Sequence, residues 1–162
     1  MIVVSNTTPI IGLASIERFE LLHQVLGEVQ IAQAVYDEAV SAGREEGGAK
    51  REVSTASWIK TIAVQDRLAV EVLLDELDLG EAETIVLARE VNADWVVMDE
   101  KKGRRKLDQL GMQKIGTLGL LLKAKQAGLL SVIRPDVERL HLQGFSLSQA
   151  VIHAVLVEAG EH

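Results

Sequence analysis

Residues 78–106 of the chain read DLGEAETIVLAREVNADWVVMDEKKGRRK, and this stretch carries signals for a helix, a strand and two kinds of charged side chain. Asp78 followed three positions later by Glu81 is a capping box, which predicts a helix over Glu81–Val91. The apolar run Trp95–Met98 then predicts a strand that is covered on both faces. A helix that leads into such a strand is typical of a mainly parallel sheet.

The rest of the chain repeats this alternation. Further strand-like runs lie at Ile2–Val4, Glu28–Ile31, Trp58–Val64 and Lys114–Ile115. Helical patterns lie at Ser15–Leu26, Gln33–Ala42, Lys50–Ala56, Arg67–Leu74, Gly103–Leu110, Leu118–Ala127 and Leu147–Ala159. We therefore predict an α/β fold with a mainly parallel central sheet of about four to five strands, flanked by helices on both faces. A loop is expected at residues 43–48, and a second capping box is expected at Ser146.

Composition limits the classes of function. The chain has 162 residues, the size of one domain, and it lacks cysteine, which excludes thiolate catalysis and cysteine zinc sites. Its net charge of −7 is not that of a protein that binds nucleic acid through phosphate attraction alone. The N-terminus lacks the basic region of a signal peptide, and no apolar run approaches the roughly 20 residues of a membrane span. We expect a cytoplasmic protein without membrane association.

Four polar side chains fall where they can meet at the carboxyl edge of the predicted sheet, which is the edge where ligands bind in open parallel sheets. These side chains are Asn6, Glu38, Glu81 and Asp99. Thr7 and Thr8 would line the rim of the same pocket. Carboxylates held close together repel each other unless a cation neutralises them, and Mg²⁺ or Mn²⁺ suits such oxygen ligands. The four residues are therefore predicted metal ligands and catalytic residues.

A concentrated basic run follows Asp99 directly. Five of the six residues 101–106 are cations, namely Lys101, Lys102, Arg104, Arg105 and Lys106. In an acidic chain this run is a candidate phosphate-binding patch, and the arginines are favoured because a guanidinium group binds phosphate through two hydrogen bonds. Carboxylates for a metal beside cations for a phosphate are the combination that phosphodiester hydrolysis needs.

Each residue also has a simpler interpretation when it is taken alone. Asn6 is a common turn residue, Glu81 serves its capping box, Asp99 is a typical helix N-cap, and Glu38 is explained by a solvent-facing position. The basic run, taken by itself, is usually a solvated helix face. Their order along the chain favours a common site instead. A doubly wound small-molecule domain is disfavoured because no glycine-rich loop follows the first strand.

The sequence resembles the PIN-domain family, and more closely a prokaryotic PIN subfamily that is often paired with antitoxins. The resemblance is carried by VVSNTTPIIGLASIERFELL, VYDEAV, DLGEAETIVLARE and VVMDEKKGRRKLDQLGMQKIGTLGLLLKAKQAGLL. The tail GFSLSQAVIHAVLVEAGE is similar to that subfamily's ending. The resemblance implies a PIN-like domain over residues 1–130 and a C-terminal helical extension over residues 131–162, packed on the same domain.

The resemblance also implies an activity and partners. PIN domains are Mg²⁺- or Mn²⁺-dependent ribonucleases that cleave RNA, and many are toxins that a cognate antitoxin neutralises. They commonly form homodimers. For this chain the resemblance implies an endoribonuclease, with nucleic-acid contacts from the two threonines and from Lys101, Lys102, Arg104 and Arg105.

Matching the family's acids to this sequence exposes one departure. The second, third and fourth acids fall on Glu38, Glu81 and Asp99, with Glu83 as a nearby alternative for the third. The family's first acid is replaced by Asn6, and the hydroxyl that usually follows it matches Thr7 or Thr8. The sequence leaves open whether Glu100 joins the site. Because an amide brings no charge, the alternative function is a catalytically impaired PIN fold that binds nucleic acid or protein.

Overall fold

The computed structural model describes residues 1–42 and 49–162, so the loop predicted at residues 43–48 lies outside the described residues. Within them the chain forms a five-stranded sheet in which every strand is parallel to its neighbours, in the order β3-β2-β1-β4-β5. The strands are β1 (Val3–Ser5), β2 (Val29–Ala32), β3 (Ile59–Ile62), β4 (Trp95–Val97) and β5 (Lys114–Ile115). The predicted α/β class and parallel sheet are confirmed.

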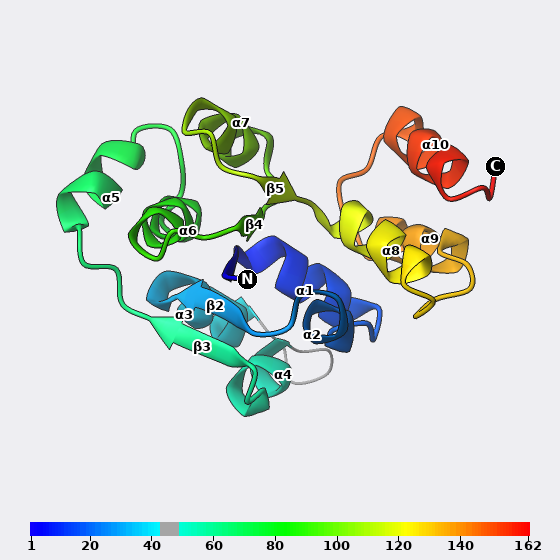
Figure 1. Ribbon diagram of the computed structural model, residues 1–162, viewed down its shortest axis with the longest axis horizontal. Helices are drawn as coiled ribbons and strands as arrows, with labels where there is room; N and C mark the ends of the chain where they lie inside the picture. The colour runs from blue at the N-terminus through cyan, green and yellow to red at the C-terminus, as the bar shows by residue number, and fades with distance from the viewer. Residues whose placement is uncertain (43–48) are drawn as a thin grey trace.

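Helices flank this sheet (Figure 1). The first five are α1 (Thr7–Ser15), α2 (Glu20–Leu26), α3 (Gln33–Ala42), α4 (Ala49–Thr55) and α5 (Arg67–Leu73). The others are α6 (Leu79–Glu90), α7 (Lys101–Gln109), α8 (Thr117–Gln126), α9 (Arg134–Leu142) and α10 (Gln149–Glu158). In Figure 1, α7 lies on one side of β4 and β5 and α1 lies on the other. None of the described helices is long and apolar enough to cross a membrane.

The central strands are buried on both faces, as their unbroken apolar sequence predicts. Val3 and Val4 of β1 and Val96 and Val97 of β4 have no exposed surface, and Val4 lies opposite Val96 in the ladder. The residues that follow these two strands are therefore neighbours at one edge of the sheet. β3 lies at one edge of the sheet.

The helix α6 begins with the predicted capping box. Asp78 Oδ1 accepts a hydrogen bond from the Glu81 backbone N–H at 2.8 Å, and Glu81 Oε1 accepts one from the Asp78 N–H at 3.0 Å. Most of the helix is buried because it contacts β1, β2, α3, α5 and α7. The capping box therefore fixes a buried helix start directly above the sheet edge.

The helix expected over Ser15–Leu26 is right only at its C-terminal end, because α2 begins at Glu20, while α1, which was not predicted, ends at Ser15. α1 begins directly after Asn6, whose extended backbone (φ −80°, ψ 174°) makes it the N-cap. Pro9 is tolerated in the first turn, where no backbone N–H is needed. Glu17 follows α1 with a left-handed φ of 60°, which separates it from α2. The polar cluster after β1 is thus the first turn of a helix.

The C-terminal helices pack at one end of the molecule, where α9 contacts α1 and α10 contacts α8. α10 starts at Ser148, whose Oγ accepts a hydrogen bond from the Val151 N–H at 3.1 Å. The capping box expected at Ser146 is therefore wrong: the N-cap lies two residues later, at Ser148, and its N3 residue Val151 has no polar side chain to complete a capping box. The domain division predicted at residue 130 falls between α8 and α9 and stays a prediction.

Candidate functional site

Asn6 lies at the carboxyl edge of the sheet, enclosed between β4 and α6. Its backbone N–H bonds to the Val97 carbonyl oxygen at 2.9 Å, and the residue is only 3% exposed. Its side-chain nitrogen lies 3.4 Å from the Met98 sulfur. Its side-chain oxygen lies 3.5 Å from the Thr84 hydroxyl, which is 2.7 Å from the Gly80 carbonyl oxygen and donates there in preference. The amide is therefore buried with weak partners.

Glu38 reaches the same edge from α3. Thr7, in the first turn of α1, donates a hydrogen bond to Glu38 Oε1 at 3.2 Å. A Cβ atom on Gly80 would lie 1.9 Å from that oxygen, so the absence of a side chain there lets the carboxylate sit against the start of α6. Burial raises the pKa of Glu38, and the negative charges of Asp78 and Glu83 raise it further against the opposing effect of the Thr7 bond.

Glu81 combines its capping role with a place among the other acids. The residue is 8% exposed, and burial is the main cause that raises its pKa. The bond from the Asp78 N–H lowers that pKa, while the charges of Asp78, Glu100 and Glu38 raise it. Glu81 is thus close enough to both Glu38 and Glu100 for their charges to repel its own. The capping interpretation and the site interpretation do not exclude each other.

Asp99 has a different set of partners. Its Oδ1 accepts a hydrogen bond from the Thr117 N–H at 2.8 Å, and its Oδ2 accepts one from the Thr117 hydroxyl at 2.7 Å. Burial raises the pKa of Asp99, the two Thr117 bonds lower it, the Glu100 charge raises it and the Arg104 charge lowers it. Both carboxylate oxygens therefore hold the start of α8, and the groups that shift this pKa do not include Glu38 or Glu81.

Glu100, which the sequence left open, lies closer to the other acids. It is the N-cap of α7, and its Oε1 accepts a hydrogen bond from the Thr8 hydroxyl at 2.8 Å. The consecutive threonines Thr7 and Thr8 thus bind one carboxylate each, Glu38 and Glu100, at the start of α1. Sequence reasoning could have found Glu100 only by weighing it equally with Asp99, because both follow the same strand.

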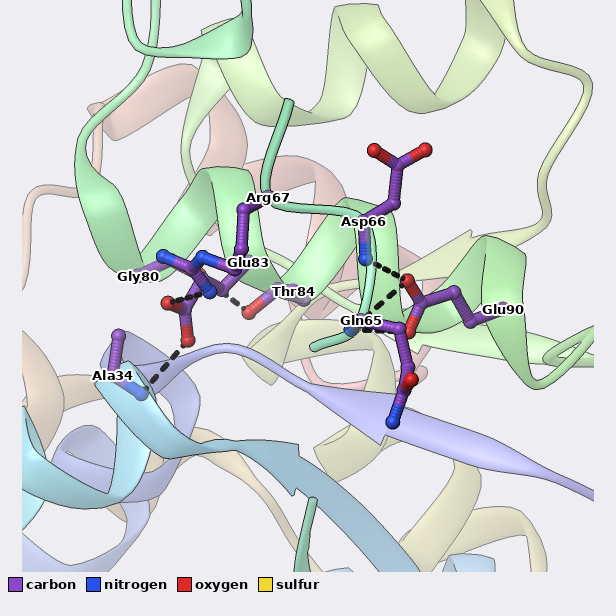
Figure 2. Close-up of polar contacts among 8 residues, drawn as sticks. All are labelled: Ala34, Gln65, Asp66, Arg67, Gly80, Glu83, Thr84 and Glu90. Atoms are coloured by element: carbon purple, nitrogen blue, oxygen red, sulfur yellow. Dashed lines mark hydrogen bonds and ion pairs between the residues drawn. The ribbon is translucent and has the colours of Figure 1, made fainter. Parts of the chain in front are cut away.

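Glu83, the alternative third acid, serves the fold instead. Figure 2 shows its carboxylate between the backbone of Ala34 and the side chain of Arg67. Oε1 accepts a hydrogen bond from the Ala34 N–H at 3.0 Å, and Oε2 pairs with the Arg67 guanidinium at 2.8 Å. Glu90, also in Figure 2, accepts bonds from the N–H groups of Gln65 and Asp66. These contacts tie α6 to α3 and to the segment that begins α5.

The predicted phosphate-binding cations lie on α7 beside the acids. Lys101, Lys102 and Arg105 are exposed. Arg104 is half-buried, and its Nη1 donates a hydrogen bond to the Met98 carbonyl oxygen at 2.7 Å. Lys106 pairs with Glu76 at 3.3 Å. Three of the four predicted cations are thus exposed, while Arg104 uses one of its five N–H donors on the Met98 carbonyl oxygen and keeps the others for a ligand.

The donor atoms at this edge are hard oxygens, which suit Mg²⁺ or Mn²⁺. Within residues 1–42 and 49–162, no group of three or more acidic or histidine side chains is arranged to hold a metal ion. Mg²⁺ binds through one or two carboxylates and keeps several waters, so two carboxylates suffice. Burial first, and then the charges of Asp78, Glu100 and Glu38, raise the pKa of Glu81, so a cation beside Glu81 would relieve a repulsion that includes both candidate partners. The residues fit a water-rich cation site.

Comparison with known proteins gives one family. A family model described as a PIN domain matches residues 2–161, which is nearly the whole chain. No curated protein matches the sequence. The match includes the acids at the sheet edge, the basic helix and both C-terminal helices.

Proposed function

Because the chain belongs to the PIN-domain family, we propose that it is a divalent-metal-dependent endoribonuclease whose cation is Mg²⁺ or Mn²⁺. The PIN domain is a nuclease-type fold, and PIN domains generally depend on divalent metal ions. One observation carries the proposal: the adjacent threonines Thr7 and Thr8 hold the carboxylates of Glu38 and Glu100 at 3.2 and 2.8 Å, and after burial and the Asp78 charge the charges of these two acids also raise the pKa of Glu81. A cation removes this repulsion, so the acids and the ion stabilise each other.

The proposal assigns different tasks to the acids. A bound Mg²⁺ or Mn²⁺ supplies an activated water and neutralises charge on the leaving oxygen. Glu38 and Glu81 would hold the ion, and Asn6 would add a neutral amide oxygen. Asp99 is a positioning residue, because Thr117 occupies both of its oxygens and connects it to α8.

The nucleic-acid contacts are also part of the proposal. The exposed ammonium and guanidinium groups of Lys101, Lys102 and Arg105 would bind backbone phosphates beside the acids. Thr7 and Thr8, predicted to touch the nucleic acid, donate their hydroxyl hydrogens to carboxylates, so their proposed role is to orient those carboxylates. An RNA substrate agrees with the cytoplasmic location expected from the sequence.

The toxin role, the antitoxin partner and the homodimer belong to the same proposal. Support for a partner surface comes from apolar side chains that the C-terminal helices leave exposed. These are Leu142, which is 83% exposed, together with Val151 and Val157. Light scattering tests the homodimer directly, because a mass near 17.7 kDa would mean a monomer.

A second candidate function is RNA binding without turnover. Asn6 favours it, because the amide removes one negative charge from the metal site. The lack of a three-acid group among the described residues favours it as well. The two candidates differ in whether RNA is cleaved after it binds.

Cleavage of labelled single-stranded RNA in Mn²⁺ separates the two candidates. Wild type and Glu81→Gln are compared, with Glu71→Gln as the control because Glu71 is an exposed glutamate on α5. The nuclease proposal expects cleavage by wild type and by the control, and strong loss in Glu81→Gln. If all three proteins bind the RNA and leave it intact, the binding function is the correct one. Cleavage that survives in Glu81→Gln would contradict the proposed site.

A further inference from the structure

A cavity of about 980 Å³ adjoins the acids and extends toward the C-terminal helices. Its floor is one face of α1, formed by Thr8, Ile11, Gly12 and Ser15, which follow helical spacing. Thr8 is the residue that binds Glu100, so the floor of the cavity begins at the candidate metal site. The volume is at the upper end of the roughly 300–1,000 Å³ of small-molecule sites, which leaves room for a nucleotide unit.

The two ends of the cavity differ in chemistry. The end beside α7 is charged and includes Asp99, Glu100, Lys101 and Arg104. The opposite end is mainly apolar and includes Phe145, Leu147, Val151 and Val155 from the C-terminal segment, with Ser146 among them. A nucleotide has the same division, because a charged phosphate is joined through a sugar to a flat base with polar edges.

Phe145 is the aromatic side chain among the lining residues. The chain contains only two phenylalanines, one tyrosine and two tryptophans, so a ring at this place is a selective feature. The ring is half-buried and rests on α1: a Cβ atom on Gly12 would lie 2.6 Å from its Cε2 atom. The turn before it uses Gly144 with a left-handed φ of 92°. α1 and this turn together hold the ring beside the cavity.

We propose that this cavity is a nucleobase subsite, in which one unstacked base of a single-stranded RNA lies against Phe145 while its phosphate faces Lys101 and Arg104. This inference rests on the proposed function only in that RNA is the ligand. Proteins that bind single strands combine a basic track with aromatic platforms, since every base has a flat face. Double-stranded RNA does not fit, because its bases remain stacked inside the duplex.

The test combines removal of one base from the RNA with substitution of Phe145, in the manner of a double-mutant cycle. Fluorescence anisotropy measures binding of a labelled tetranucleotide, UUUU, and of versions with one abasic position each, in EDTA and in Mn²⁺, with a gel to confirm an intact probe. Wild type is expected to lose affinity about 5- to 150-fold at one abasic position. Phe145→Leu is expected to bind the intact and abasic probes equally. Phe19→Leu is the matched control, because Phe19 packs on Trp58, with ring centroids 5.0 Å apart, and does not line the cavity.

The outcomes are separable. If base removal weakens binding equally in wild type and in Phe145→Leu, the subsite is refuted and the cavity is left for another ligand, such as a peptide. If wild type binds neither probe, the proposed RNA function itself fails. Phe145→Trp guards against a folding defect, because it keeps an aromatic platform: it must restore the difference between the intact and abasic probes, and its failure to do so also refutes the subsite.

Discussion

Replacing Asn6 by aspartate is the change that most directly tests the account of the metal site. The amide is 3% exposed, and its nitrogen faces the Met98 sulfur at 3.4 Å. A carboxylate has no hydrogen to donate to that sulfur. The Thr84 hydroxyl gives little compensation, because it donates to the Gly80 carbonyl oxygen at 2.7 Å. The new carboxylate at position 6 would therefore be buried without a full set of donors.

The expected cost follows from that loss of partners. A buried polar group left without a partner costs about 1–3 kcal/mol, and a charged one costs more. For a domain of 150–250 residues, 1 kcal/mol corresponds to roughly 2–4 °C in melting temperature. We therefore expect Asn6→Asp to melt about 2–12 °C below wild type in EDTA at pH 7. Asn92→Asp is the control, because Asn92 is the other asparagine of the chain and is exposed.

The pH dependence of this difference has a definite sign. Burial without donors would raise the pKa of the new carboxylate above the unfolded value near 3.9, so the folded variant would bind more protons than the unfolded one. The cost is then absent below the unfolded pKa and fully present above the raised folded pKa. The gap between wild type and Asn6→Asp should therefore narrow as the pH falls from 7 toward 4.

Divalent metal should stabilise Asn6→Asp more than it stabilises wild type. The added charge strengthens a cation site that otherwise has an amide, and a ligand at 100 times its Kd stabilises a fold by about 2.7 kcal/mol. We expect Mn²⁺ to raise the melting temperature of Asn6→Asp more than that of wild type, as measured by circular dichroism. The reasoning is refuted if Asn6→Asp and wild type have the same melting temperature in EDTA, or if Mn²⁺ raises both melting temperatures equally.

Three further predictions use contacts of the same edge and of the C-terminus. Gly80→Ala should leave the free energy of unfolding unchanged or raise it by up to about 1 kcal/mol, because alanine has the higher helix propensity. The same change should weaken Mn²⁺ binding measured by calorimetry, because the new Cβ displaces the Glu38 carboxylate. Thr117→Val should cost about 1–3 kcal/mol in urea unfolding at pH 7, and less near pH 4, because removing the hydroxyl raises the pKa of Asp99 further. Burial disfavours the Glu161 carboxylate, but hydrogen bonds from Lys125, Ile133 and Arg134 outweigh burial and lower its pKa to about 2. Glu161→Gln should therefore increase hydrogen exchange in α10, and unchanged exchange at pH 7 would contradict this prediction. In wild type the stabilising effect of these bonds should be lost as the pH falls from 4.5 toward 2.

The fold was predictable where buried residues recur with the regular spacing of a strand or a helix. The helix Gln33–Ala42 and the strand Lys114–Ile115 match their predicted bounds, and the other predicted strands overlap the observed ones. α1 was missed because its sequence, TTPIIGLAS, has no clear 3.6-residue alternation. Six of its nine residues are buried, so no polar face marks it as a helix. A pattern that depends on one exposed face fails for a helix that is covered on most sides.

The site was predictable in its residue types and less so in its partners. Sequence order places Asp99 and Glu100 at the end of the same strand. The directions of their side chains decide that Asp99 accepts a hydrogen bond from Thr117 and Glu100 accepts one from Thr8. The contact of Phe145 with α1 joins residues more than a hundred positions apart, and the sequence carried no periodic signal for it. Such pairings depend on the tertiary packing of separate elements, which composition and local spacing do not determine.

Threonine hydroxyls fix the direction of three carboxylates at the acidic edge of the sheet. Thr7, Thr8 and Thr117 each donate to a carboxylate, at 3.2, 2.8 and 2.7 Å respectively. One hydroxyl hydrogen is worth about 0.5–1.5 kcal/mol in net stability, or up to about 3 kcal/mol when the acceptor is charged, and it occupies only one of the lone pairs of a carboxylate. On Glu38 and Glu100 a cation could therefore bind the remaining lone pairs without breaking these bonds, whereas both oxygens of Asp99 already accept hydrogen bonds from Thr117. The threonines set the direction of the carboxylates. If the chain is the proposed nuclease, a cation would supply the missing positive charge, and because Asn6 is neutral, the affinity for that cation would limit turnover.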